Sequence, residues 1–215
     1  MKISTLLVCV LSCLVANVLG ARKGETLTPE QLAQKRLDGM YELEKSAVGG
    51  VINLNADQYL EYVQKNPRPY DVVILWNVPP GKCDHCEAVS DEFNQAAYSF
   101  YSHRKDPAKL NNKKIFFAKI LFVQEGGIMN VFKNAGFTTI PYLTVSPLDL
   151  KRDSVGTDIF TTENKWLISS QEVFDANKQI EFVNNALRTD VKITFTFTAI
   201  LTKNSFGFVV IALFF

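Results

Sequence analysis

The stretch "YDVVILWNVPPGKCDHCEAVSDEFNQAAYSF" (70–100) joins an apolar run, a pair of cysteines and a helical pattern. Its first part, 70–77, is apolar without interruption and rich in β-branched residues, which is typical of a strand covered on both faces. After Cys86, apolar residues recur at helical intervals. The sequence therefore places Cys83 and Cys86 at the junction between a buried strand and an amphipathic helix.

The rest of the chain continues this alternation of strands and helices. Further strands are predicted at 51–54, 113–123 and 142–146, with an edge strand within 158–166. Helices are predicted to begin at Thr28 and end near Gly49-Gly50, to run from Asn55 to Pro67, to span 128–134, and to begin at Ser169. Strands that alternate with helices indicate an α/β protein whose mixed sheet is flanked by helices on both faces. The order of the elements is typical of a thioredoxin-like fold.

The first twenty residues have the layout of a secretory signal peptide. Lys2 precedes an apolar run that ends in small residues, so we expect cleavage of 1–20 before Ala21. Cys9 and Cys13 would be removed with this segment, which leaves the 83–86 pair as the cysteines of the mature chain. A secretory route leads into an oxidising lumen, where thiols form disulfides.

The remaining sequence divides into three parts. We expect an N-terminal helical extension at 21–44, a thioredoxin-like lumenal domain at 45–190 and a hydrophobic tail at 191–215. The tail is long enough for a single or partial transmembrane segment across a bilayer of about 30 Å. Lys203 and Asn204 lie in its middle, where a charge is costly.

The cysteine pair has the arrangement of a thiol-exchange site. A thiol attacks a disulfide as its thiolate, and the free amides at a helix N-terminus stabilise that charge. Cys83 is predicted at the helix start and Cys86 one turn further, so the two side chains share a face and can form a bridge. Cys83 is thus the predicted nucleophile and Cys86 the resolving thiol.

Charged neighbours act on this pair in opposite directions. His85, when protonated, and Lys82 favour the thiolate, whereas Asp84 and Glu87 disfavour it. The sign of the net effect stays open.

The competing interpretations of the cysteine pair are a zinc site and a purely structural disulfide. Zinc needs four ligands, but only Cys83, Cys86 and His85 are close together, and His103 belongs to a polar stretch typical of a solvated loop. A bridge across two intervening residues closes too small a loop to stabilise a whole domain. We therefore predict neither a metal nor any other cofactor.

The segment "GFTTIPYLTVS" (136–146) adds a second signal for the same site. Ile140-Pro141 directly precedes a predicted strand, where a trans proline would be awkward, although a trans proline in a plain turn remains the alternative. A cis bond would place the Ile140 backbone beside the disulfide, free to pair with an extended peptide.

These motifs together resemble a known family. The signal peptide, "LTPEQLAQKRLDGM", "WNVPPGKCDHCEAVSDEFNQAAYSF", "NKKIFFAKILF", the "TIP" segment and "FVNNALRTDVKI" look like the thioredoxin-domain subunit of oligosaccharyltransferase, the subunit three/six family. As in that family, and unlike ordinary thioredoxins, no tryptophan directly precedes the first cysteine. The resemblance covers residues 25 to about 192.

The resemblance implies an accessory subunit in protein N-glycosylation, anchored in the endoplasmic reticulum membrane. Cys83 and Cys86 would form transient mixed disulfides with nascent glycoprotein chains that carry cysteines near acceptor sites, and Pro141 would lie on the peptide side. The partners implied are those chains and the other transferase subunits. Because the family continues into further transmembrane helices, we expect this chain to be shortened after its lumenal domain. The family has also been linked to magnesium transport, for which no residue here argues.

Two other functions remain open. The chain could be a free lumenal disulfide oxidoreductase or isomerase, or a peptide-binding module whose cysteines are locked in an inert disulfide. Whether the chain acts as an enzyme in its own right is therefore undecided. A nucleic-acid partner is not expected, because 23 basic side chains are balanced by 22 acidic ones.

Overall fold

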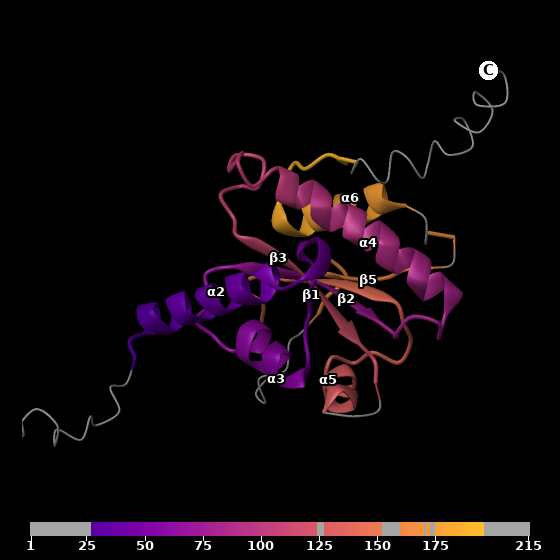
Figure 1. The fold of residues 1–215 in the computed structure, drawn as a ribbon, viewed down its shortest axis with the longest axis horizontal. Coiled ribbons are helices and arrows are strands. Elements are labelled where there is room, and N and C mark those ends of the chain that lie inside the picture. Colours follow the sequence, from indigo (N-terminus) through magenta and orange to yellow (C-terminus); the bar gives the residue numbers. More distant parts are fainter. Residues whose placement is uncertain (1–26, 124–126, 152–159, 170, 173–174, 196–215) are drawn as a thin grey trace, which may run out of the picture.

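The computed structural model describes residues 27–123, 127–151, 160–169, 171–172 and 175–195. Over these ranges the chain forms a five-stranded mixed sheet with helices on both faces (Figure 1). The predicted signal peptide and most of the predicted hydrophobic tail lie outside the described residues.

Helices and strands alternate along the chain. The helical elements are α2 (Pro29–Lys45), the 3-10 turn η1 (Val48–Gly50), α3 (Ala56–Tyr59), the π-helical η2 (Leu60–Gln64), α4 (Asp84–Ser102), α5 (Ile128–Asn134) and α6 (Ala176–Leu187). The strands are β1 (Ile52–Asn53), β2 (Asp71–Asn77), β3 (Ile115–Leu121), β4 (Tyr142–Ser146) and β5 (Lys165–Leu167). The apolar runs predicted as strands are therefore confirmed, although the edge strand occupies only the end of its predicted range and continues one residue beyond it.

The sheet has the strand order β1-β3-β2-β4-β5. β1 and β2 pair with β3 in parallel, whereas β4 runs antiparallel to both β2 and β5. A side-chain hydrogen bond supports the central antiparallel pair, since Trp76 Nε1 donates to Thr144 Oγ1 over 2.8 Å. The carboxyl ends of β2 and β3 and the amino end of β4 consequently lie at one end of the sheet.

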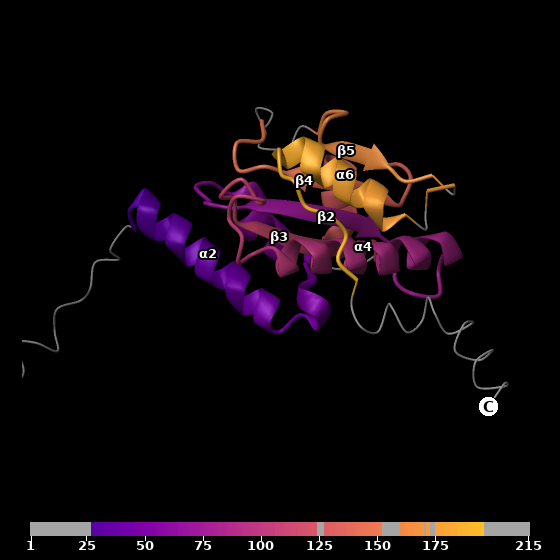
Figure 2. The same ribbon diagram turned by 90° about the horizontal axis from the view of Figure 1, so that it is seen from above.

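Alternate residues of the buried strands enter two separate cores. In β2, Val72, Ile74 and Trp76 pack on the face covered by α2, α3 and α5, whereas Val73 and Leu75 pack beneath α4 and α6 (Figures 1 and 2). The side-chain alternation of a strand requires this division. The uninterrupted apolar run of 70–77 thus reflects burial on both faces, as predicted.

Helix α2 has the predicted start but an earlier end. The capping box of Thr28 and Gln31 forms, and Pro29 opens the helix. The helix ends at Lys45 rather than near Gly49-Gly50, because the backbone becomes extended at Ala47, with φ -86° and ψ 140°. The first turns of α2 extend beyond the sheet (Figure 2).

The last helix begins later than predicted. Ser169 and Glu172 do interact, with Ser169 Oγ donating to Glu172 Oε2 over 2.8 Å, but they form an isolated turn. Asp175 caps α6 instead, since its side chain accepts the N–H groups of two following residues. Of the predicted apolar face, Val173 lies outside the described residues, and Ile180, Val183 and Leu187 are buried.

The helix predicted from Asn55 also ends early. Its capping box with Gln58 forms, but the helix stops at Gln64, ahead of the cis bond between Asn66 and Pro67. These corrections concern the ends of elements and leave their order intact. The predicted α/β, thioredoxin-like fold, with a mixed sheet between helices, is confirmed.

Candidate redox site

Cys83 and Cys86 form a disulfide at the N-terminus of α4, with their Cα atoms 5.2 Å apart. Cys83 is the N-cap residue and is partly exposed, whereas Cys86 is only 2% exposed. The Cys86 N–H donates to the Cys83 sulfur over 3.2 Å. Since free amides at a helix N-terminus stabilise a thiolate, the outer sulfur is the one placed for attack on another molecule.

Asn77 holds the inner cysteine in place, and the sequence patterns did not identify it. This buried residue ends β2, where its Nδ2 donates to the Cys86 carbonyl over 2.7 Å. Its Oδ1 accepts the Val78 N–H over 2.9 Å. One amide therefore fixes the first turn of α4 against the end of the central strand. A polar residue closing an otherwise apolar run was the available signal.

Ile140-Pro141 lies at the same end of the sheet as the disulfide. The peptide bond is cis, as predicted. Tyr142 pairs with Trp76 in the register of β4 and β2, so the preceding Pro141 lies where β2 leads into the cysteine loop. Pro141 is buried and its carbonyl accepts the Ile168 N–H over 3.1 Å, while Ile140 is partly exposed. Pairing of Ile140 with a peptide stays a prediction.

The charged neighbours of the pair are all exposed. His85 and Lys82, the predicted thiolate-tuning residues, face solvent, and so do Asp84 and Glu87. Water and salt screen charges at such positions. We therefore expect a small net influence of these four side chains on the thiolate.

A cavity of about 210 Å³ adjoins Cys86, the inner cysteine of the disulfide. Cys86 lines it together with Asn77, Ser90 and Lys119, which the sequence patterns also did not single out. Lys119 Nζ donates to Ser90 Oγ over 2.6 Å and to Asn94 Oδ1 over 2.8 Å. Burial lowers the pKa of Lys119 to about 8, against the opposing effect of the Asp91 carboxylate. In the sequence, the feature that could have identified Lys119 is its position as a charged residue inside the apolar run of β3.

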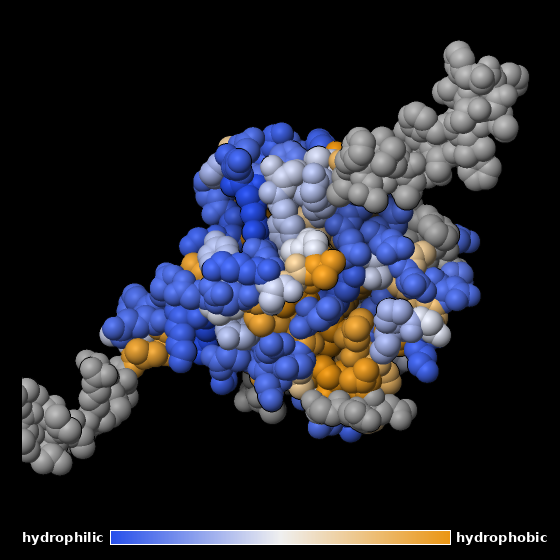
Figure 3. Space-filling view, in the orientation of Figure 1, coloured by the Kyte–Doolittle hydropathy of each residue, from blue (hydrophilic) through white to orange (hydrophobic). Residues whose placement is uncertain are grey.

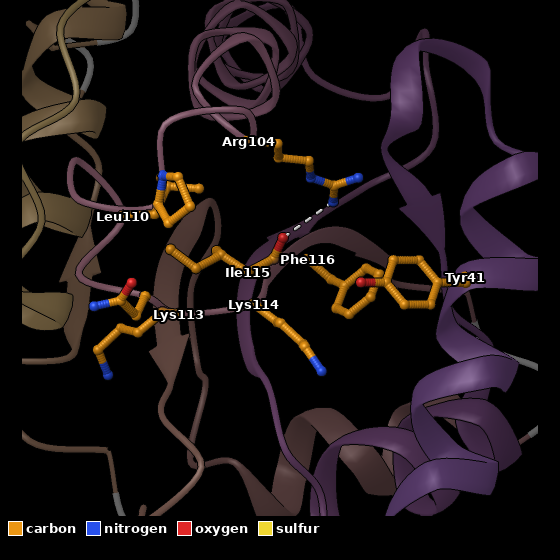
Figure 4. Close-up of a pocket in the computed structure, with 9 residues that line it drawn as sticks. Tyr41, Arg104, Leu110, Lys113, Lys114, Ile115 and Phe116 are labelled. Atoms are coloured by element: carbon orange, nitrogen blue, oxygen red, sulfur yellow. Dashed lines mark hydrogen bonds between the residues drawn. The ribbon is translucent and has the colours of Figure 1, made fainter.

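A second cavity, of about 260 Å³, lies at the opposite end of the sheet, where β3 begins (Figure 4). Two of the cations that line it, Arg104 and Lys113, already interact with other groups of the fold. Arg104 binds Glu44 and the Ile115 carbonyl, and Lys113 lies 3.3 Å from Asp71. This cavity contains no thiol and is remote from the disulfide.

Apolar side chains are exposed near the cysteine end of the sheet. Figure 3 shows them gathered over α5 and the adjoining end of the sheet. Val123 and Met129 are 39% and 48% exposed there. Since α5 follows the carboxyl end of β3, this surface lies on the disulfide side of the molecule.

Metal-binding and membrane-spanning features can be judged only over the described ranges. Within them, no cluster of three or more histidine, cysteine or acidic side chains could hold a metal ion. Among the helices that the structure describes, none is long and apolar enough to cross a membrane.

Comparison with known proteins adds a family and a set of similar structures. The family model described as "OST3 / OST6 family, transporter family" matches residues 38–215, which is most of the chain. A search among curated proteins finds no match. Thioredoxin f from spinach chloroplast has a TM-score of 0.45 at 15% identity, over 69% of this chain and 93% of that structure. The Trx4 domain of ERdj5 has a TM-score of 0.37 at 17% identity, over 62% and 90%.

Proposed function

The chain belongs to the OST3/OST6 family, and on this basis we propose that its Cys83–Cys86 pair forms transient mixed disulfides with nascent glycoproteins. As a family member it is a thioredoxin-like accessory subunit of oligosaccharyltransferase, the complex that it shares with other subunits. The family is associated with the endoplasmic reticulum. We further propose that the described domain is lumenal and that the tail at 191–215 contributes to membrane anchoring.

The arrangement of the two sulfurs carries this proposal. A client thiolate would attack Cys83, form a bond to its sulfur and break the Cys83–Cys86 bond, which releases Cys86 as the leaving group. Attack by Cys86 on Cys83 later would re-form the internal disulfide and release the client as a thiolate. The partly exposed outer sulfur and the buried inner sulfur fit these two roles.

A tethered client would stay extended beside the transferase. The exposed apolar side chains Val123 and Met129 and the Ile140 backbone offer contacts for such a segment. Delayed folding near a cysteine would keep a neighbouring Asn-x-Ser/Thr site accessible. This is how an oxidoreductase fold would assist glycosylation.

Replacement of the resolving cysteine tests the proposal. In Cys86→Ser, the Cys83 thiolate attacks a client disulfide, bonds to one of its sulfurs and releases the other as a thiolate. No internal thiol can open the resulting mixed disulfide, so clients should accumulate on the full-length protein. Mass spectrometry should identify glycoprotein precursors with cysteines near acceptor sites. Cys83→Ser is the matched control and should trap few clients, because its remaining thiol is buried.

Two results would contradict the proposal. No trapped client, together with a wild-type disulfide that does not exchange with glutathione, would indicate a non-redox peptide-binding module. Strong reduction of insulin, without enrichment of glycoproteins among the trapped clients, would indicate a free oxidoreductase instead.

A further inference from the structure

Lys119 lies within the central part of the sheet, beneath the N-terminal half of α4. Its neighbours in register are Leu75 on β2 and Asn53 on β1. Its side chain is partly buried and reaches the oxygens of Ser90 and Asn94, both of which are neutral. The ammonium group is thus held by dipoles in a site where burial penalises its charge.

The same cavity brings Lys119 and the inner cysteine together. Cys86 and Lys119 both line this space of about 210 Å³, which is large enough to hold water between polar groups. The remaining walls come from β1, from the loop after β2 and from the first turns of α4. Two carboxylates face the lysine from α4, Glu87 on the cavity wall and Asp91, and both are exposed.

The proposed exchange creates a charge at this buried position. When a client opens the disulfide, Cys86 leaves as a thiolate, and a 2% exposed site stabilises a thiolate poorly. A proton donor inside the cavity would remove that charge.

Resting on the thiol exchange proposed above, we propose that Lys119 donates a proton to the Cys86 sulfur, through cavity water, as the disulfide opens. In this step the client sulfur bonds to Cys83, the Cys83–Cys86 bond breaks, and its electron pair moves to the Cys86 sulfur. An N–H bond of Lys119 breaks and an S–H bond forms on Cys86, so that thiolate and ammonium become neutral thiol and amine. In the reverse step the amine takes the proton back and the client leaves as a thiolate.

The acidity of the two groups suits this exchange. The pKa of Lys119 is about 8, and an ordinary cysteine thiol has a pKa of about 8.5. Burial of Cys86 makes its thiol a weaker acid than this ordinary value, so transfer of the proton from the Lys119 ammonium to the Cys86 sulfur is favourable.

The test measures how fast reduced glutathione opens the disulfide of the full-length protein between about pH 6 and 10, with rates divided by the fraction of glutathione present as thiolate. For the wild type, this normalised rate of disulfide opening should be independent of pH near pH 7. It should fall as pH rises through about 8, where Lys119 loses its proton. Lys119→Met should be slower at neutral pH by about 100-fold or more, and its rate should not fall at alkaline pH. Lys114→Met, at an exposed site just before β3, should behave as wild type.

Lys119→Arg separates proton donation from charge. Arginine keeps a positive charge but does not release a proton in this pH range, so this variant should be as slow as Lys119→Met. A wild-type rate in Lys119→Arg, or a wild-type pH profile in either variant, would overturn the proposal. A lower melting temperature with an unchanged pH profile would assign Lys119 a purely structural role. A wild-type disulfide inert to glutathione would instead contradict the proposed thiol exchange itself.

Discussion

Asn77 is a buried amide whose two ends serve different neighbours. Its Nδ2 donates to the Cys86 carbonyl and its Oδ1 accepts the Val78 N–H. In Asn77→Asp, a carboxylate oxygen takes the place of Nδ2 and faces the Cys86 carbonyl, to which it cannot donate a hydrogen bond. We expect the free energy of unfolding to fall by about 1–3 kcal/mol at neutral pH, because a buried acceptor loses its donor.

The effect of Asn77→Asp should depend on pH with a definite sign. Burial raises the pKa of the introduced carboxyl above its unfolded value of about 3.9, so the native state binds more protons than the unfolded state. Stability relative to wild type should therefore decrease as pH rises from about 4 to 8. Urea denaturation at several pH values measures this difference. Asn130→Asp, at an exposed position in α5, is the control, and an equal loss there would contradict the role of Asn77.

The cysteine pair could be predicted from sequence, whereas Asn77 and Lys119 could not be assigned a role. The two cysteines are one helical turn apart, so a local pattern determines that they meet. Lys119 reaches Ser90 across 29 positions of the chain, and Asn77 meets the Cys86 carbonyl only because α4 folds back on the sheet. A pattern of apolar residues predicts burial but not which polar groups meet inside.

At the scale of the element, the turn η1 packs closely against Tyr101 of α4. Gly49 and Gly50 both have positive φ, 64° and 77°, but their surroundings differ. A Cβ on Gly49 would meet nothing within 4 Å, whereas one on Gly50 would lie 2.4 Å from the Tyr101 ring. That ring is fixed by its hydroxyl, which donates to the Gly50 carbonyl over 2.6 Å.

The two glycines therefore form a matched pair for mutation. Gly49→Ala should cost about 1–2 kcal/mol of unfolding free energy, from backbone strain alone. Gly50→Ala should cost about 1–3 kcal/mol more, since the Tyr101 ring must also move. Chemical denaturation of both variants measures the difference, and equal losses would show that the Tyr101 contact does not matter.

Element ends were harder to predict than elements because capping motifs are short. Three such motifs occur, and those at Thr28 and Asn55 begin helices. At Ser169 the Glu172 carboxylate accepts from the Ser169 N–H and Oγ, but the Glu172 N–H donates to the Ser169 carbonyl, so a turn forms and α6 begins at the cap of Asp175. A local hydrogen bond is compatible with a helix but does not require one. The packing of Ile180 and Leu187 beneath the sheet fixes where the last helix lies.

At the scale of the molecule, the order of strands and helices could be predicted but the role of α2 could not. The apolar runs predicted the strands, and the alternation of strands with helices predicted a sheet covered by helices on both faces. The sequence patterns placed α2 in an extension before the domain. In the structure, Leu37 and Met40 of this helix belong to the same core as β2 and β3. Arg36 adds a hydrogen bond to the Pro67 carbonyl, over 2.9 Å.

This packing predicts that α2 contributes to the stability of the whole domain. Met40 is 0% exposed, so Met40→Ala removes buried methylene groups and leaves a cavity. The free energy of unfolding should fall by about 2–5 kcal/mol, in a single transition with an unchanged denaturant dependence. Leu27→Ala, at a site 41% exposed before the helix, should change the free energy of unfolding by less than about 0.5 kcal/mol.

If both variants matched wild type, or if Met40→Ala produced a separate early transition, α2 would be an independent extension. A single destabilised transition would instead place the start of the folded domain at α2, since its core side chains would then unfold together with the sheet that carries the disulfide.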